Sequence, residues 1–373
     1  MQPWENDMAL YGQACSFRRV MEIQPHEEAL IQGLCYRPDG KPYIKLHMQD
    51  AGSIRLAAGG KLVNLTEKDQ GWYEADIPLR PGYYRAVVCR DGVEILSPYL
   101  GITVEDNRPV NCLDIGPLPE WLGCKEVLHG DVRHEIFYSG VSGRMEPCTV
   151  YTPPGYSQTG KSYPVLYLQH GNGENELSWL WNGKINFLMD NLLAQQKAVP
   201  MIIVMANGMT VLERKPGQYE LCKAMFTRQL MEDIIPFIEK KYRVKQDREF
   251  RAMAGLSMGS KQTSITVMTH LESFAWAGLF SGFMDDFLDD YYNLHLEQLL
   301  REKDDFNRDM RLFFRAIGTE DEGLCYFLEN DRFCEENGIK NYRKMYEGGH
   351  DWNVWRNCAF DFLQMVFQES RLK

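Results

Sequence analysis

The sequence predicts an α/β domain with a mostly parallel β-sheet, preceded by a small all-β sandwich. Two observations lead to this fold class. Between about residues 28 and 115, short β-branched and aromatic segments are separated by turn residues at intervals of roughly eight to twelve positions, which is typical of a sandwich. From about residue 126 onwards, apolar runs alternate with helical stretches, and this alternation is typical of a sheet covered by helices on both faces.

The strands expected in the first region are separated by glycine, proline and aspartate turns. We predict them at residues 43–47, 54–56, 61–65, 71–77 and 83–89. The proline-bearing stretch 108–119 predicts a linker. We therefore place an N-terminal segment and the sandwich in residues 1–115, and the α/β domain in residues 116–373.

The second region is expected to open with an antiparallel pair of strands, at residues 132–138 and 147–151. Further strands are expected at 165–168, 202–205, 250–254, 277–280 and 312–317. Helices are expected at 186–195 and 226–241, and apolar residues of the second helix share one face: Leu230, Ile234, Ile235 and Ile238. In a sheet of this kind, ligands bind beyond the carboxyl ends of the strands.

Composition and charge narrow the class of protein. The 373 residues carry a net charge of −11, which disfavours nucleic acid and an anionic membrane surface as partners. The N-terminus lacks a basic segment followed by an apolar core, and no apolar run is long enough to cross a bilayer. The ten cysteines are scattered without a CxxC pair, which favours reduced thiols in a cytoplasmic protein. Because His and Cys do not cluster, we expect no metal and no other cofactor.

Residues 255–259 form a GxSxG pattern with Ser257 at its centre. The segment before it is predicted to be a buried strand, and residues 260–270 after it are predicted to be a helix. On a sharp strand-to-helix turn the serine hydroxyl stands clear of the sheet, and the flanking glycines avoid collision with the neighbouring strand and helix. We therefore predict that Ser257 is the nucleophile of an α/β-hydrolase.

The nucleophile needs a base, and in α/β-hydrolases the chain order is serine, acid, histidine. His270 lies on the helix that leaves the nucleophile and should point away, and His295 lies in an acidic stretch where a surface position is expected. His350 follows a glycine-rich loop near the C-terminus and is the candidate base. The strand expected at 312–317 runs into the sequence GTEDE, in which Asp321 is the candidate acid and Glu320 the alternative.

Ester chemistry at a serine also needs two backbone N–H groups directed at the developing oxyanion. One is expected from Met258, the residue after the nucleophile. The other is expected from the turn after strand 165–168, where we favour the amide of Asn172 over that of Gly171. His170, in the same turn, is expected to shape the loop rather than to act on the substrate.

Several stretches resemble the esterase D-like α/β-hydrolases, which include the feruloyl and acetylxylan esterases of carbohydrate esterase family 1. These stretches occur in the family's order over about residues 130–365: YPVLYLQHGNGENELSW, NFLMDNLLAQQKAVPMIIVMANG, RQLMEDIIPFIEKKYRV, RAMAGLSMGSKQT, FAWAGLFSG and GGHDWNVWR. The resemblance implies that Ser257, Asp321 and His350 form a catalytic triad. Ser260 departs from the pattern, since many relatives carry a second glycine there.

The resemblance also implies that Trp179 and Trp352, with Gly171, lie at the substrate pocket, and the loop 210–224 is expected to overhang it. In the first region, the sequences GWY at 71–73 and PLRPGYY at 78–84 resemble an immunoglobulin-like module related to glycogen-binding modules. For Trp72 we expect a packing role rather than a platform for sugar.

Together these features predict a serine carboxylic-ester hydrolase that works through an acyl-enzyme. The expected substrate is a small-molecule or oligosaccharide ester, such as a feruloyl or acetyl ester of plant carbohydrate. The alternatives are an esterase or acyltransferase for another small ester, such as a siderophore lactone or a xenobiotic, and a catalytically inert glycan-binding protein. The sequence neither requires nor excludes a homo-oligomer.

Overall fold

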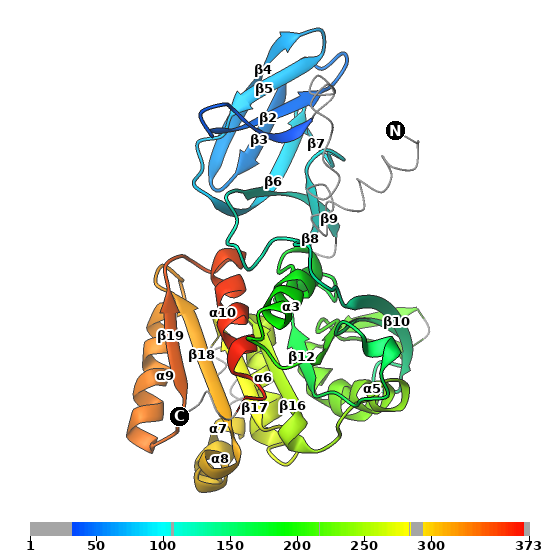
Figure 1. The fold of residues 1–373 in the computed structure, drawn as a ribbon, viewed down its shortest axis with the longest axis vertical. Helices are drawn as coiled ribbons and strands as arrows, with labels where there is room; N and C mark the ends of the chain where they lie inside the picture. Colours follow the sequence, from blue (N-terminus) through cyan, green and yellow to red (C-terminus); the bar gives the residue numbers. More distant parts are fainter. Residues whose placement is uncertain (1–31, 106–107, 216, 283, 285–293, 369–373) are drawn as a thin grey trace. The chain divides into compact units, whose positions relative to one another are not determined.

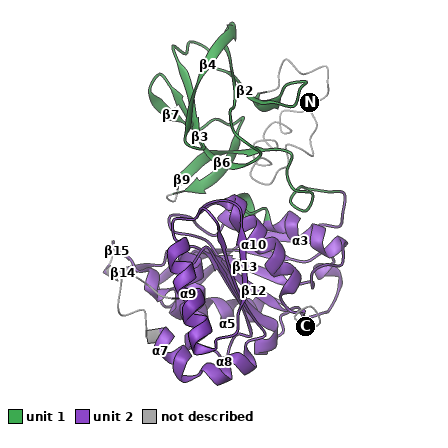
Figure 2. Cartoon of the chain, turned by 90° about the vertical axis from the view of Figure 1, so that its left-hand side faces the viewer, with its two compact units in different colours: residues 1–125, 180–184 green, residues 126–179, 185–373 purple. Residues whose placement is uncertain are grey.

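A computed structural model describes residues 32–105, 108–215, 217–282, 284 and 294–368 (Figure 1). The chain forms two compact units, one of residues 1–125 and 180–184 and the other of residues 126–179 and 185–373 (Figure 2). The N-terminal segment that we assigned to the first domain, up to residue 31, lies outside the described residues. Within the described part of the chain, no helix is both long enough and apolar enough to cross a membrane.

The first unit is built of antiparallel β-strands, in the order β1-β2-β5-β4-β3-β6-β9-β8 with β7 beside β6. The strands are β1 (Gly33–Tyr36), β2 (Pro42–His47), β3 (Ile54–Ala58), β4 (Lys61–Asp69), β5 (Trp72–Asp76), β6 (Gly82–Arg90), β7 (Val93–Ile95), β8 (Gly101–Glu105) and β9 (Arg108–Ile115). Alternate side chains point into one core, so that Ile44 and Leu46 of β2 meet Val88 of β6 and Leu113 of β9. This alternation is what an antiparallel sheet with one buried face requires.

One expectation for the first unit was wrong. Residues 108–115 are not a linker but strand β9, because Val110, Leu113 and Ile115 alternate into the core while the strand pairs with β6 and β8. The prolines and the glycines around this segment concealed the period of two. Trp72 packs between Lys45 and the His47 ring, which agrees with the packing role expected for it, and the neighbouring Tyr73 is the more deeply buried aromatic.

A short segment that lies within the second unit's stretch of the sequence, residues 180–184, belongs to the first unit. The side-chain oxygen of Asn182 accepts hydrogen bonds from the hydroxyls of Tyr83 and Thr103. The ammonium of Lys184 lies 2.6 Å from the carboxylate of Asp114, and both side chains are largely buried. Buried polar groups matched in this way hold the segment to the β-structure.

The second unit contains an eight-stranded sheet in the order β10-β11-β13-β12-β16-β17-β18-β19. Its strands are β10 (Asp131–Ser139), β11 (Arg144–Thr152), β12 (Val165–Gln169), β13 (Ile202–Ala206), β16 (Arg251–Leu256), β17 (Trp276–Phe280), β18 (Leu312–Gly318) and β19 (Tyr342–Tyr346). The first two pairings, β10 with β11 and β11 with β13, are antiparallel, and the remaining pairings are parallel. The central strands are buried along their whole length because helices cover both faces.

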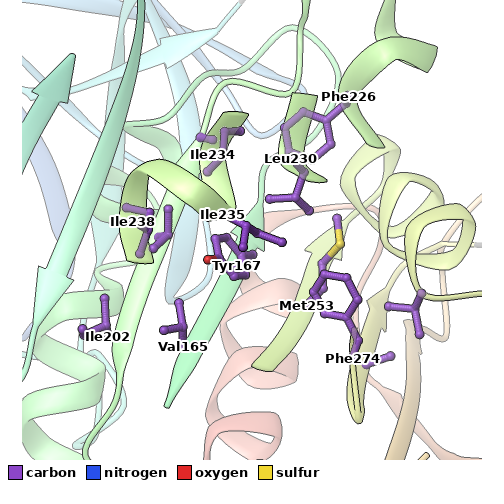
Figure 3. Packing of buried hydrophobic residues seen from close by; sticks show 14 of the residues in the cluster. Val165, Tyr167, Ile202, Phe226, Leu230, Ile234, Ile235, Ile238, Met253 and Phe274 are labelled. Carbon is purple, nitrogen blue, oxygen red and sulfur yellow. The ribbon is translucent and has the colours of Figure 1, made fainter. Parts of the chain in front are cut away.

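Helices cover both faces of this sheet (Figure 1). They are α2 (Ser178–Trp181), α3 (Ile185–Ala194), α4 (Phe226–Gln229), α5 (Ile235–Lys241), α6 (Met258–Thr269), α7 (Leu294–Arg301), α8 (Lys303–Asp309), α9 (Leu324–Asn337) and α10 (Trp352–Met365), with short turns η3 (Tyr156–Gln158), η4 (Lys223–Met225), η5 (Leu230–Ile234) and η6 (Arg248–Phe250). On one face, α10 packs on α3, β17 and β18. On the other, Ile234, Ile235 and Ile238 pack over Val165 and Tyr167 of β12 (Figure 3).

The helix expected at 226–241 is divided into three pieces. Residues 230–234 form the π-helical turn η5, and Pro236 follows in the first turn of α5. Proline has no N–H to donate and its ring collides with the preceding turn, so the register changes just before it. The loop expected at 210–224 is a hairpin of β14 (Val211–Lys215) and β15 (Gln218–Leu221).

The strand order reverses at β12, and this reversal positions the site. The chain passes from β12 to β13 on one side and then returns to place β16 on the other side of β12. The ends of β12 and β16 are in register, with Gln169 opposite Gly255. The loops that follow these two strands therefore lie side by side, at the position where open α/β sheets bind ligands.

Candidate active site

Ser257, His350 and Asp321 form one hydrogen-bonded series. The Nε2 atom of His350 lies 2.9 Å from Oγ of Ser257, and its Nδ1 atom lies 2.9 Å from Oδ2 of Asp321. The three residues are 93 and 29 positions apart in the chain, and each follows the carboxyl end of a parallel strand. The sequence-predicted nucleophile, base and acid are thus brought together.

The backbone at Ser257 is strained, with φ 51° and ψ −116°, between the end of β16 and the start of α6. The two glycines of the motif allow this turn to pack closely. A Cβ at Gly255 would lie 2.5 Å from the carbonyl carbon of Gly259, and a Cβ at Gly259 would lie 2.6 Å from the carbonyl oxygen of His170. The turn therefore tolerates no side chain at either position, which is the physical reason for the GxSxG pattern.

Asp321 is buried at 4% exposure, whereas the competing Glu320 is exposed and uses its backbone amide to bond Gly348. Burial by itself raises the pKa of Asp321. Hydrogen bonds and charge from His350, with the amide of Gly323, outweigh burial, so the pKa lies below its usual value. The carboxylate is therefore ionised at neutral pH and can orient the imidazole of His350.

Backbone hydrogen bonds join the acid loop, which follows β18 and carries Asp321, to the histidine loop, which follows β19 and carries His350. The amide of Thr319 donates to the carbonyl of Tyr346 at 2.7 Å, and the amide of Glu320 donates to Gly348 at 2.8 Å. At Gly318, a Cβ would lie 2.2 Å from the carbonyl oxygen of Gly348. The two loops could not approach so closely with any side chain at position 318.

The residues after His350 also fix its position. The carboxylate of Asp351 accepts from the amides of Asn353 and Val354 and caps the N-terminus of α10. The Trp355 ring meets the His350 ring edge to face, with centroids 5.1 Å apart. The imidazole is therefore held by a helix cap, an aromatic ring and the carboxylate of Asp321.

The two backbone amides expected for the oxyanion are those of Met258 and Asn172. Within the described residues, neither amide donates to another protein group, and Met258 opens helix α6. The amide of Gly171, our alternative donor, is already bonded to Oε2 of Glu174 at 2.9 Å. Asn172 is therefore the better candidate, and the positive end of α6 adds to the field at the same position.

His170 supports the loop after β12 that carries Gly171 and Asn172, which we call the oxyanion loop. Its Nε2 atom accepts from the amide of Gly208 at 2.9 Å, and its Nδ1 atom lies 2.7 Å from the carbonyl oxygen of Gly171. Complete burial lowers its pKa to about 4. The ring is therefore neutral at pH 7, with its proton on Nδ1, and these contacts agree with the loop-shaping role expected for it.

Trp179 and Trp352 are 1% and 5% exposed, and their rings pack against each other with centroids 5.0 Å apart. The indole N–H of Trp179 donates to the carbonyl of Gln169 at 2.7 Å. In these positions the two rings support the loops around the nucleophile. Contact of Trp179 and Trp352 with the substrate stays a prediction. Gly171 lies at the nucleophile, since a Cβ there would be 3.6 Å from Cβ of Ser257.

The other two histidines after the nucleophile lie elsewhere. His270 caps the far end of α6. The expectation that His295 is a surface residue was wrong: it is 2% exposed, because the inward face of α7 turns it toward the carbonyl of Met284. Among the described residues, no group of three or more His, Cys, Asp and Glu side chains could hold a metal ion.

The contacts of two residues near this loop, Glu174 and Lys223, were not predicted from the sequence. Glu174 bonds Gly171 and also the indole N–H of Trp352, 178 positions away. The ammonium of Lys223, in η4 after the β14–β15 hairpin, donates to the side-chain oxygen of Asn172. No motif marks either contact, because each joins segments that only the fold brings together.

The chain is similar in sequence to a protein family and to several known proteins. The Esterase family model matches residues 139–365. The endo-1,4-beta-xylanase/feruloyl esterase of Xylanibacter ruminicola is 33% identical over 344 residues, which cover 88% of this chain and 45% of that protein. The endo-1,4-beta-xylanase Y of Acetivibrio thermocellus is 30% identical over 159 residues, which cover 39% of this chain and 14% of that protein. The chain thus spans less than half the length of these relatives.

Among solved structures, a ferulic acid esterase is 27% identical and superposes with a TM-score of 0.54 over 65% of this chain and 99% of that chain. The enterobactin esterase of Shigella flexneri reaches a TM-score of 0.63 over 93% of this chain and 99% of that chain, at 13% identity. The second likeness concerns the fold alone.

Proposed function

We propose, from the premise that this chain belongs to the Esterase family, that it is a serine hydrolase cleaving carboxylic esters through an acyl-enzyme on Ser257. One observation carries the proposal: the hydrogen-bonded series from Ser257 through His350 to the buried carboxylate of Asp321. A serine hydroxyl becomes nucleophilic only when a base removes its proton, and this series supplies the base and the group that orients it.

In the first half of the reaction, Nε2 of His350 takes the proton from Ser257 as its Oγ attacks the ester carbonyl. The carbonyl oxygen becomes an oxyanion that the amides of Met258 and Asn172 can stabilise. His350 then gives the proton to the alcohol oxygen, the C–O bond breaks, and the acyl group remains on Oγ. The proton that His350 takes from Ser257 therefore leaves with the alcohol.

In the second half, water takes the place of the alcohol. His350 removes a proton from the water, whose oxygen attacks the acyl carbonyl, and the same two amides can stabilise the second oxyanion. Collapse releases the carboxylic acid and returns the proton to Oγ of Ser257. Throughout, the ionised carboxylate of Asp321 keeps the imidazole in the tautomer with its proton on Nδ1 and stabilises the imidazolium that forms twice.

The substrate class that we propose is a feruloyl ester of plant carbohydrate. The support is the 33% identity to the xylanase/feruloyl esterase over 88% of this chain, together with the 27% identity to a ferulic acid esterase of known structure. Acetyl esters of the same carbohydrates are the alternative. We also propose residues 116–373 as the esterase domain. The immunoglobulin-like type of the β-structure and a cytoplasmic location stay predictions.

The proposal is tested with purified protein and Ser257→Ala, using methyl ferulate, acetylated xylan and p-nitrophenyl acetate. We expect hydrolysis of methyl ferulate that falls by roughly 10⁶-fold in the variant, as in other serine hydrolases that lose the nucleophile. A variant as active as the wild type would refute a role for Ser257. Cleavage of acetylated xylan but not of methyl ferulate would show that the substrates are acetyl esters and not feruloyl esters. Products formed with sugar acceptors would identify acyl transfer.

A further inference from the structure

Glu174 joins the two halves of the proposed site. Its Oε2 atom accepts from the amide of Gly171 at 2.9 Å, and its Oε1 atom accepts from the indole N–H of Trp352 at 2.9 Å. Gly171 belongs to the oxyanion loop after β12, and Trp352 begins the helix that follows His350. We propose that Glu174 is a positioning residue, which holds the oxyanion loop in register with the histidine loop; this inference rests on the proposed esterase function.

The bond to Gly171 decides which amide is free to serve the oxyanion. Glu174 engages the amide of Gly171, and its own amide donates back to the carbonyl of Gly171 at 3.3 Å, which closes a tight turn. The next amide along the chain, that of Asn172, is left for the substrate. Because Gly171 lies against Leu256 and Ser257, a change in this turn moves the amide relative to the nucleophile.

The bond to Trp352 extends the connection to the base. The Trp352 ring packs edge to face on Trp355, with centroids 5.3 Å apart, and Trp355 packs in the same way on the ring of His350. Trp352 is buried, so its indole N–H needs an acceptor in the protein. Glu174 supplies that acceptor and thereby links the oxyanion donor and the general base.

The chemistry of the two partners requires a carboxylate at this position. The amide of Gly171 and the indole N–H of Trp352 are both donors, and an ionised carboxylate is an acceptor at both oxygens. A glutamine has one oxygen and one NH₂ group, so one of its ends would face another donor. The substitution Glu174→Gln therefore breaks one bond of the pair while keeping nearly the same shape.

The first test is the rate of p-nitrophenyl acetate hydrolysis by Glu174→Gln. We expect kcat to fall by about 10- to 100-fold with KM little changed, because a misplaced donor weakens the transition state and not the bound substrate. The rate of labelling by a fluorophosphonate, which needs Ser257, His350 and the oxyanion donors but no particular ester, should fall in parallel. Glu176→Gln is the matched control, since it removes a carboxylate from the same loop, and it should keep the wild-type kcat.

The second test is rescue by Trp352→Phe, which removes the indole N–H and keeps an aromatic ring. In the double variant E174Q/W352F the glutamine oxygen can accept from Gly171 while its NH₂ group faces a ring without a donor. We expect Glu174→Gln to reduce kcat much less in the W352F protein than in the wild type. If Glu174→Gln alone does not fold, the test is kcat of E174Q/W352F against that of W352F: a change within about threefold supports the inference, and a loss of 10-fold or more contradicts it.

Two results would overturn the inference: a kcat of Glu174→Gln within about twofold of wild type, or the same fold-loss in both backgrounds, since groups that do not interact give additive effects. A wild-type protein that is neither labelled by the fluorophosphonate nor active on any ester would refute the proposed function itself. Labelling without the Glu174 effect would refute the positioning role alone.

Discussion

The two sides of the candidate site are held in different ways. On the acid–base side, the loops that carry Asp321 and His350 are joined by backbone hydrogen bonds and by the close approach of Gly318 to Gly348. On the oxyanion side, the loop after β12 is held by its own side chains: Glu174 and His170 both bond Gly171, and they reach Trp352 and Gly208 in other segments. The geometry of the first pair of loops therefore depends on glycine at position 318. The geometry of the second loop depends on side chains that can make particular hydrogen bonds.

This difference predicts where substitutions act. On the acid–base side, adding even one carbon at a glycine should be severe. On the oxyanion side, exchanges that preserve hydrogen-bonding character should be tolerated, and the effects should be smaller and specific to kcat.

The largest effect is expected on the acid–base side, from Asp321→Asn. An amide there stabilises the wrong tautomer of His350 and cannot stabilise the imidazolium, and a comparable change in a serine protease costs about 10⁴ in kcat. Steady-state hydrolysis of p-nitrophenyl acetate measures it. Glu320→Gln is the control and should stay near the wild-type rate, because that side chain is exposed. A large loss of kcat in Glu320→Gln, with little loss in Asp321→Asn, would show that Glu320 and not Asp321 is the acid of the triad.

A smaller but still severe effect is expected from Gly318→Ala. The added Cβ would lie 2.2 Å from the carbonyl oxygen of Gly348, so the histidine loop must move. We expect kcat to fall about 100-fold, as a displacement near 1 Å can cause, with a lower melting temperature. At Gly349 a Cβ would have only ordinary contacts, the nearest at 3.8 Å, so Gly349→Ala should lose far less. Equal losses in the two variants would contradict the close-approach argument.

His170 should make stability on the oxyanion side depend on pH. Its pKa falls from 6.5 to about 4 on folding, so between these values the unfolded chain binds more protons than the folded one. Stability should therefore fall as pH decreases from about 6.5 to about 4, by up to roughly 3 kcal/mol from this group. Thermal unfolding across this range should show a weaker pH dependence for His170→Gln. An unchanged dependence would show that His170 is not the group responsible.

The smallest effect is expected from Lys223→Met. The ammonium bonds the side chain of Asn172, not the backbone amide assigned to the oxyanion, and it is solvent-accessible. Exposed charged contacts contribute less than about 1 kcal/mol, so kcat should change by no more than roughly fivefold. A loss of 100-fold would mean that the hairpin side of the loop positions the donor as strongly as Glu174 does.

The same difference explains what could be predicted from the sequence. Ser257, His350 and Asp321 could be located because backbone-held turns leave glycines in the sequence, as in GxSxG and before the acidic run at 320–322. Glu174 and Lys223 left no such trace, because a glutamate or lysine in a loop looks the same whether it faces solvent or another loop. In the first unit, β9 was mistaken for a linker because Pro109 lies in it, although Val110, Leu113 and Ile115 alternate into the core.

The most direct test of the central claim, that Ser257 forms an acyl-enzyme, is mass spectrometry of the protein quenched with acid during turnover of methyl ferulate. The account predicts a feruloyl adduct on the peptide that contains Ser257, lost in Ser257→Ala and accumulating to a different level in Asp321→Asn. An adduct on another residue, or turnover of methyl ferulate by Ser257→Ala at the wild-type rate, would contradict it.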